Sequence, residues 1–212
     1  AFLLMSRGQN EYDDVTEKAG LGRKRHRRTY GGSFVDLDND GDVDLLTVND
    51  FAGIDIYRND GNGTFIDITD AVVDEASNFG MSAAFADYDN DGALDFFVTG
   101  MASTTARRLQ ALGLGRKEFP RINGMRTRMA FGNRMYLKRG TSKYRQPPFS
   151  RSVARSGWSW GCAAFDFGND GNVDIYITNG NYSGKSSRDF CTRFWTHDIY
   201  VQSSGPDPVL DN

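Results

Sequence analysis

Asp36-Leu37-Asp38-Asn39-Asp40-Gly41-Asp42-Val43-Asp44 is the first of three copies of one acidic loop in this sequence of 212 residues. The second copy is Asp87-Tyr88-Asp89-Asn90-Asp91-Gly92-Ala93-Leu94-Asp95, and a weaker third copy is Asp166-Phe167-Gly168-Asn169-Asp170-Gly171-Asn172-Val173-Asp174. Copies of one motif separated by tens of residues are typical of solenoids and propellers. The sequence therefore predicts a repeat protein in which each copy belongs to one unit of an array.

The first two copies bring oxygen atoms around one point. Carboxylates stand at loop positions 1, 3, 5 and 9, and the glycine at position 6 lets the chain turn so that position 7 adds its backbone carbonyl. Ca²⁺ binds about six to eight such oxygens. The predicted ligands are the side chains of Asp36, Asp38, Asp40 and Asp44 with the carbonyl of Asp42, and the side chains of Asp87, Asp89, Asp91 and Asp95 with the carbonyl of Ala93.

The third copy differs at position 3, where Gly168 replaces a carboxylate. Its remaining candidate ligands are Asp166, Asp170, Asn172 and Asp174. Either water completes this site, or the site is weak or empty.

An EF-hand begins with a similar loop but needs a Glu at position 12 and a helix on either side. Position 12 here is Thr47, Val98 or Ile177, and the residues that follow each loop are rich in β-branched and aromatic types, as strands are. We therefore expect calcium loops inside β-hairpins. The alternative without a metal is that Asp, Asn and Gly serve only as turn residues.

Composition and charge fit a turn-rich β protein with local acidity. The sequence has 24 glycines, 5 prolines and a net charge of -3. The three loops hold 12 of its 28 acidic residues, which leaves 25 basic residues against 16 acidic ones elsewhere. The acidity therefore belongs to the loops, and the remaining surface is mildly basic.

The compartment is predicted from several weak signals. No apolar run approaches the roughly 20 residues of a membrane span, and residues 1–5 are too short for a secretory signal, so we expect a processed chain or a fragment. Cys162 and Cys191 either pair in an oxidising compartment or are two buried thiols. Open calcium loops favour an extracellular or cell-surface location, where Ca²⁺ is abundant.

Two hairpins are expected in each repeat, which gives four strands, the content of one propeller blade. The second hairpins are residues 55–69 and a longer pair at 135–140 and 148–153, and residues 3–16 form a similar hairpin. The expected boundaries are the end of a preceding blade (1–22), a first calcium repeat (23–80), a second calcium repeat (81–158) with an insertion at about 102–131, and a third repeat with a C-terminal tail (159–212).

The insertion, one basic run and the small residues before each loop support further predictions. Residues 103–112 are capped like a helix, and the rest of the insertion is basic, which suits either a partner contact or a solvated excursion. The basic run 23–28 has no aromatic platform or recognition helix beside it, so we expect a solvated loop or a contact with an acidic neighbour rather than nucleic acid. Small residues before each loop (31–33, 81–84 and 161–164) indicate strands crowded around an axis.

Signals for catalysis are few. The chain has two histidines, His26 and His197, and no Gly-x-Ser-x-Gly motif. Cys191 and His197 are a conceivable dyad, but Cys191 fits a core or disulfide position better. The sequence therefore predicts a protein that is not an enzyme.

The loops, with Phe79-Gly80 upstream of the second one, resemble FG-GAP or VCBS repeats of the integrin-α type. Residues 157–161 (Gly-Trp-Ser-Trp-Gly) and 57–65 are similar to the ASPIC/UnbV and cartilage-acidic-protein group. The resemblance implies a secreted or surface calcium-binding β-propeller used for adhesion or scaffolding. Three repeats are fewer than the about four to eight blades of a closed ring, so we expect either part of a longer chain or subunits that complete one another by strand exchange.

Two functions follow as hypotheses. The first is an extracellular structural or adhesive calcium-binding module of about three four-stranded blades, which binds a protein partner or itself. The second is a carbohydrate-binding or hydrolase-associated propeller domain, in which Trp158, Trp160 and Trp195 contact sugar instead of packing in the core.

Overall fold

The structure, a computed structural model, describes residues 1–115, 118–140 and 143–179. Within these residues the chain forms two four-stranded antiparallel sheets and two two-stranded hairpins. The predicted all-β, propeller-like architecture with one partly helical insertion is confirmed.

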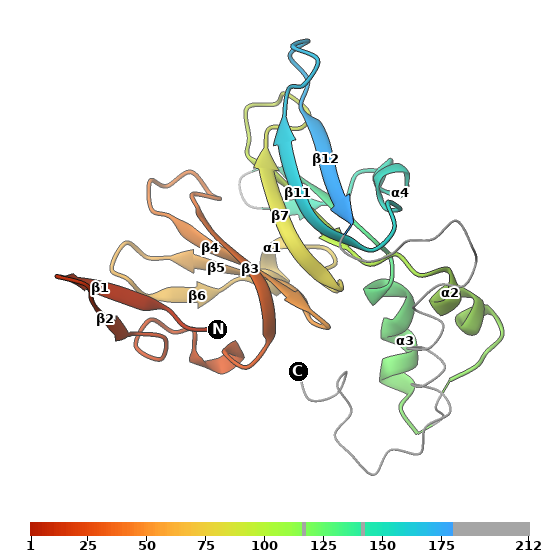
Figure 1. Cartoon of the computed structure of the whole chain (residues 1–212), viewed down its shortest axis with the longest axis horizontal. Helices are drawn as coiled ribbons and strands as arrows, with labels where there is room; N and C mark the ends of the chain where they lie inside the picture. The colour runs from red at the N-terminus through yellow and green to blue at the C-terminus, as the bar shows by residue number, and fades with distance from the viewer. Residues whose placement is uncertain (116–117, 141–142, 180–212) are drawn as a thin grey trace.

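The elements follow one another in the order of the repeats (Figure 1). The first hairpin consists of β1 (Leu4–Gly8) and β2 (Glu11–Asp14), and a short 3-10 turn, η1 (Gly22–Lys24), follows it. The first large sheet contains β3 (Arg28–Val35), β4 (Asp44–Asp50), β5 (Gly53–Asn59) and β6 (Phe65–Asp67), followed by α1 (Thr69–Val72). The second large sheet contains β7 (Gly80–Ala86), β8 (Asp95–Gly100), β9 (Arg134–Arg139) and β10 (Lys143–Arg145), and the last hairpin is β11 (Ser159–Phe165) and β12 (Asp174–Asn179).

Each acidic loop joins the first two strands of its sheet. The loops connect β3 to β4, β7 to β8 and β11 to β12, and each of these pairs is antiparallel. Position 12 of every loop lies in the second strand of its pair, as the β-branched residues there predict. The interpretation as hairpin loops, not EF-hands, is therefore confirmed.

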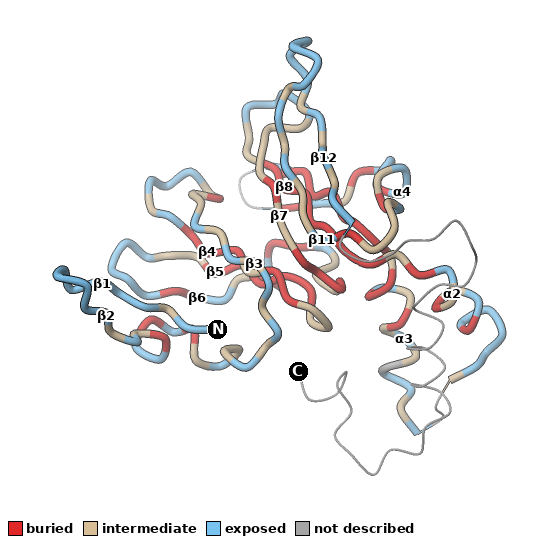
Figure 2. The backbone as a smooth tube through the Cα atoms, in the orientation of Figure 1, coloured by how far each residue is buried: buried red, intermediate tan, exposed pale blue. Residues whose placement is uncertain are grey.

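The sheets pack face to face because alternate residues of a strand point to opposite faces. Leu46 of β4 lies with Phe96 and Tyr136 in the core between the two large sheets. Phe97, the next residue of β8, points the other way and packs against Ile175 of the last hairpin. Figure 2 shows this buried backbone where the sheets meet, with exposed loops at their outer ends. Each of the two large sheets therefore has a core on both faces, as a propeller blade does.

Small residues allow the first strands of successive sheets to approach closely. The strand β7 contacts β3 and β4 on one side and β11 on the other. A Cβ atom at Gly31 would lie 3.4 Å from the carbonyl oxygen of Met81, and one at Gly80 would lie 2.6 Å from Cγ1 of Val48. A side chain at position 80 would thus force the sheets apart.

The insertion between β8 and β9 folds into two helices, α2 (Thr104–Ala111) and α3 (Pro120–Met129). The Ser103 side chain accepts the backbone N–H of Ala106 at 3.2 Å and caps α2, which confirms the helix expected at 103–112. The second helix, α3, was not expected, although its first residue, Pro120, is a known start signal. Both helices bury residues against Phe79 and neighbouring apolar side chains.

The hairpin expected between 135–140 and 148–153 is wrong in its second strand. The partner of β9 is β10, and residues 150–153 form the short helix α4 (Ser150–Val153). Pro147 and Pro148 lack a backbone N–H and cannot donate to a ladder. Tyr144, in contrast, is buried in the core between the large sheets. Its burial places β10 earlier in the chain than the expected strand at 148–153.

Candidate metal centre

The three acidic loops share one backbone design. In the first loop Asp36 Oδ1 accepts the N–H groups of Asn39 at 2.7 Å and Asp40 at 3.2 Å, and Asp36 Oδ2 accepts that of Gly41 at 3.0 Å. The residue at position 4 is an asparagine with positive φ in every copy, at 67°, 56° and 53°. Asparagine tolerates this left-handed conformation better than most residues. Each loop is therefore shaped by its own residues.

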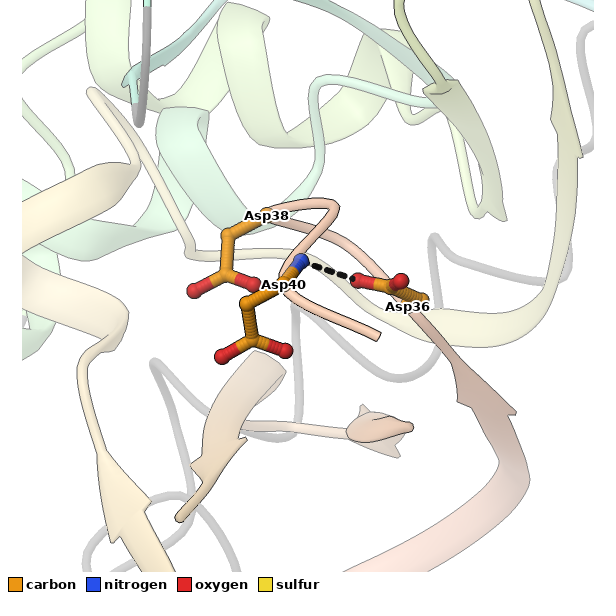
Figure 3. A group of neighbouring side chains, drawn as sticks. All are labelled: Asp36, Asp38 and Asp40. Atoms are coloured by element: carbon orange, nitrogen blue, oxygen red, sulfur yellow. Dashed lines mark hydrogen bonds between the residues drawn. The ribbon is translucent and has the colours of Figure 1, made fainter. Parts of the chain in front are cut away.

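The loop backbone brings carboxylates together in the first two copies. Asp36, Asp38 and Asp40 each offer an oxygen, and these oxygens lie within 4.8 Å of one another. Figure 3 shows the three side chains on one turn, with the N–H of Asp40 donating to Asp36. The second loop forms an equivalent group from Asp87, Asp89 and Asp95. Oxygens this close suit a hard divalent cation.

The carboxylate at position 3 of the first loop has the environment that most favours a bound cation. Asp38 Oδ1 is buried and has no hydrogen-bond donor. A buried carboxylate oxygen without a donor is costly, because desolvation is not compensated. A cation bound beside Asp36 and Asp40 would compensate it.

The carboxylate at position 9 has a second role, which is to tie the loop to the third strand of its sheet. Asp44 Oδ2 accepts the N–H of Leu37 at 3.0 Å, and its Oδ1 accepts that of Asn59 at 2.9 Å. In the second loop Asp95 Oδ1 accepts the N–H of Lys138 at 2.7 Å. Asp44 and Asp95 are 1 % and 0 % exposed.

Burial raises the pKa of the Asp44 and Asp95 carboxyl groups, although their backbone hydrogen bonds oppose this effect. The charges of the other loop carboxylates raise both pKa values further. A divalent cation reverses this second effect, because it favours the ionised form of every neighbouring carboxylate.

The second loop has a protein cation next to it. Arg139 Nη1 lies 2.8 Å from Asp89 Oδ2 and 3.4 Å from Asp91 Oδ2. The hydrogen bond to Asp89 raises the pKa of the Arg139 guanidinium. The guanidinium therefore offsets part of the negative charge of Asp89 and Asp91, and a metal ion bound by these two side chains would compete with it for their oxygens.

The third loop keeps the backbone design without the carboxylate group. Asp166 Oδ1 accepts the N–H of Asp170 at 3.1 Å, and Asp166 Oδ2 accepts that of Gly171 at 2.8 Å. Among the described residues, however, this loop does not form a group of three carboxylates within 4.8 Å. Asp174 is exposed, since no third strand covers it in the part of the chain that the structure describes.

Two predicted ligands, Asp44 of the first loop and Asp91 of the second, are not members of these carboxylate groups. The Asp42 carboxylate lies beside the turn at Gly61, where a Cβ atom would be 2.5 Å from Asp42 Oδ2. The carbonyl ligand role of Asp42 and Ala93 stays a prediction. The N–H of Ala93 donates to Asp91 Oδ1 at 2.9 Å, so Asp91 also shapes the loop.

Sequence reasoning missed two residues that hold the first loop from the second sheet. Lys138 Nζ donates to the carbonyl oxygen of Leu37 at 2.7 Å, and the Tyr144 hydroxyl donates to the same oxygen at 3.1 Å. Both side chains are buried. Because each lies about a hundred residues from Leu37 along the chain, no local pattern could have identified the contact.

The basic run 23–28 has acidic partners within the chain. Lys24 Nζ and Arg27 Nη1 each lie 2.6 Å from Asp55 Oδ1, which is 1 % exposed. Arg25 Nη1 lies 3.0 Å from Glu17 Oε1. Of the two interpretations of this run, contact with an acidic neighbour is the one observed.

The remaining candidates divide between core, surface and residues beyond the described part. Trp158 packs with the apolar cluster around Phe79, whereas Trp160 is 41 % exposed. Cys162 is half-buried, and burial raises the pKa of its thiol. Its proposed pairing with Cys191, the dyad of Cys191 with His197, and Trp195 lie outside the described residues.

The stacked antiparallel sheets and the repeated acidic loops define a β-propeller repeat protein. Residues 36–98, which contain the first two loops, match the FG-GAP-like repeat family, whose repeats form β-propellers. Cartilage acidic protein 1 of Xenopus tropicalis is 25% identical over 184 residues, which are 86% of this chain and 24% of that protein. The chain thus carries FG-GAP-like repeat sequence, as its loops indicate, and spans about a quarter of the length of this relative.

Among the described residues, no helix has both the length and the apolar character that a membrane span requires.

Proposed function

We propose that this chain is a calcium-stabilised β-propeller segment of an extracellular protein, and that its role is structural or adhesive rather than catalytic. The observation that carries the proposal is the pair of carboxylate groups, Asp36, Asp38 and Asp40 in one loop and Asp87, Asp89 and Asp95 in the other. Open loops of this kind bind Ca²⁺ usefully only where it is abundant, outside the cytosol. The name of the similar relative, which refers to cartilage, supports the same location.

Calcium in this proposal holds hairpins together. The ion would be bound by the side chains at positions 1, 3, 5 and 9 and the carbonyl at position 7 of each of the first two loops. The position-9 carboxylates are also hydrogen-bonded to third strands, so an ion there stabilises the whole sheet. The repeats carrying these ions are residues 23–80 and 81–158, followed by a third at 159–212.

The proposal predicts a calcium-dependent stability that can be measured directly. Thermal unfolding of the purified chain should occur at a higher temperature in Ca²⁺ than in chelator, and titration calorimetry should show two sites. At a free Ca²⁺ concentration of 100 times Kd, each site adds about 2.7 kcal/mol to the free energy of unfolding. Unchanged unfolding in chelator would refute the proposal.

A matched pair of substitutions separates a ligand from a nearby charge. Asp38→Ala removes the buried oxygen that lacks a donor, and Asp42→Ala removes the same charge from position 7, whose carbonyl is the ligand. Asp38→Ala should abolish the calcium effect at the first loop while leaving the protein in chelator as stable as wild type or more so. Asp42→Ala should retain the site. Equal losses in the two variants would contradict the predicted ligand assignment.

The partner of this segment is proposed to be another β-sheet of the same kind, from a second copy of the chain. The last hairpin exposes Phe165, Phe167 and Tyr176, at 48%, 76% and 63% of their surface. Exposed aromatic clusters on a sheet face are typical of interaction surfaces. Light scattering in Ca²⁺ should detect self-association that Phe167→Ser weakens and the exposed-site control Leu112→Ser does not. A monomer at all concentrations would refute this part.

Carbohydrate binding is the second candidate function, and one exposed aromatic pair favours it. Trp160 and Tyr30, which is 54% exposed, meet edge to face with ring centroids 6.1 Å apart. Binding to a glycan array that Trp160→Ala abolishes would support this function, and binding that survives the substitution would exclude this pair as the sugar site. The packing of Trp158 in the core argues against a role for that residue.

A further inference from the structure

A cavity unrelated to the acidic loops lies next to the helical insertion. It has a volume of about 430 Å³ and is bordered by α2, α3, β9 and α4. Figure 1 shows the three helices on the same side of the molecule. Its charged lining consists of Arg107, Arg128, Arg134, Arg151, Arg155 and Glu75. Five guanidinium groups and one carboxylate leave this wall with a net charge of +4.

Two of the arginines have structural partners. Arg134 is buried, and its Nε, Nη1 and Nη2 donate to the Ser77 carbonyl at 3.0 Å, to Gln146 Oε1 at 2.8 Å and to the Arg128 carbonyl at 2.7 Å. Arg128 Nη1 lies 3.6 Å from Glu75 Oε2. These contacts occupy Glu75, the one acidic side chain among the described residues that line the cavity.

The other three arginines, Arg107, Arg151 and Arg155, have no such partner. Within the part of the chain that the structure describes, their side chains make no hydrogen bond or ion pair. Arg107 is half-buried, and burial together with the charge of Arg155 lowers the pKa of its guanidinium. Like charges gathered in a partly dry hollow are unfavourable unless an anion joins them.

The sequence around the cavity explains why the charge is not neutralised internally. Between Glu118 and Asp166 the chain has ten arginines and lysines and no acidic residue. The insertion at 102–131 has seven basic residues and one acidic residue. A solvated excursion needs only scattered charges on its outer face, whereas here guanidinium groups from three helices, from β9 and from the chain after α4 line one hollow.

We propose that this arginine-lined cavity binds a sulfate or phosphate monoester group carried on a larger ligand. The guanidinium fork donates two parallel hydrogen bonds to such oxyanions. Three unpaired forks match the three terminal oxygens of a monoester, whereas a carboxylate has only two oxygens. The volume exceeds the needs of a single ion and lies in the range of about 300–1,000 Å³ that accommodates small organic ligands.

The choice of probes distinguishes a sulfate ester from a phosphate ester as the source of the oxyanion. The full chain in Ca²⁺ buffer is titrated with inorganic sulfate, inorganic phosphate, a sulfated heparin tetrasaccharide, its desulfated form, and a phosphoserine peptide. We expect saturable binding of the sulfated sugar or of the phosphopeptide, weaker binding of the free ions, and no binding of the desulfated sugar. Preference for one of the two esters identifies the source.

Neighbouring arginines on the same helix supply a matched control. Arg107→Gln removes a guanidinium from the cavity, and Arg108→Gln removes one from an exposed position of α2 outside the lining. Arg107→Gln and Arg155→Gln should each weaken binding of the ester by about tenfold, as expected for a charge-assisted bond. Arg108→Gln should change it by less than about twofold, as expected for an exposed charge.

Folding is checked in the same samples. Because Arg107→Gln removes like-charge repulsion, its unfolding temperature without ligand should equal or exceed that of wild type. Absence of binding to every probe, equal weakening by Arg107→Gln and Arg108→Gln, or equal binding of the sulfated and desulfated sugars would overturn the proposal.

Discussion

Replacing Gly168 by aspartate should create a third calcium site, because position 3 is the only predicted ligand position of the third loop at which the sequence lacks an oxygen ligand. Its backbone bonds repeat those of the second loop: Asp170 N–H to Asp166 Oδ1 is 3.1 Å, and the equivalent bond from Asp91 to Asp87 is 3.0 Å. A Cβ atom at position 168 would lie 3.7 Å from Cγ of Asp170, an ordinary contact. The substitution therefore adds a ligand without requiring the loop to move.

Two opposing effects set the size of the change. Without metal, the new carboxylate faces Asp166 and Asp170, and each repulsion at about 4 Å in water costs about 1 kcal/mol. With free Ca²⁺ at 100 times Kd, binding adds about 2.7 kcal/mol. Gly168→Asp should therefore be about 2 kcal/mol less stable than wild type in chelator and about 0.7 kcal/mol more stable in Ca²⁺.

The assay is the number of Ca²⁺ ions bound per chain, by titration calorimetry and native mass spectrometry. We expect two for wild type and for the control Gly168→Ala, which adds a Cβ atom without a ligand, and three for Gly168→Asp. A folded Gly168→Asp protein that still binds two ions would refute the reasoning, because the defect would then lie elsewhere in the loop. Three ions in wild type would show that water already replaces the missing carboxylate.

Three further substitutions test the packing around the site. Asp55→Asn leaves Arg27 without its carboxylate, whereas Lys24 keeps Asp67, and should lower the free energy of unfolding in urea by about 3 kcal/mol; a loss below about 1 kcal/mol would mean that the pair is solvent-screened. Burial raises the pKa of Asp50 to about 6, above its unfolded value of about 3.9, so wild type loses stability as pH rises through this interval. Asp50→Asn should therefore be the more stable protein above about pH 6, with a difference that closes below about pH 4 in urea titrations; a difference independent of pH would contradict the assignment. Lys138→Met removes a charged donor from the Leu37 carbonyl and should cost about 1.5–3 kcal/mol in urea unfolding, whereas the exposed control Lys18→Met should change little; equal effects would deny the link between the sheets.

The acidic loops were the most predictable part of the molecule. Their geometry depends on hydrogen bonds within nine residues, such as the Asp36 carboxylate accepting N–H groups three to five positions ahead. The strands after the loops followed from β-branched residues, and α2 followed from the cap at Ser103. Each of these features is local, so a short window of sequence contains its cause.

The errors share a different cause. The predicted partner of β9 lay too far along the chain. Tyr144 packs against Phe96 of its own sheet, and both are buried because the first large sheet covers them. The helix α3 has a small apolar stripe, and its stability comes from packing with α2 and Phe79. Neither contact leaves a signal in the segment that makes it.

The sequence by itself determined that acidic hairpin loops repeat in a β protein and which oxygens each loop offers, because spacing within nine residues specifies the turn. Tertiary structure alone decided which of those oxygens are buried, that Lys138 reaches the first loop from the second sheet, and that arginines from separate elements line one cavity. Such contacts join residues up to about a hundred positions apart. They depend on how the sheets stack, and the stacking is a property of the whole set of hydrophobic faces rather than of any one segment.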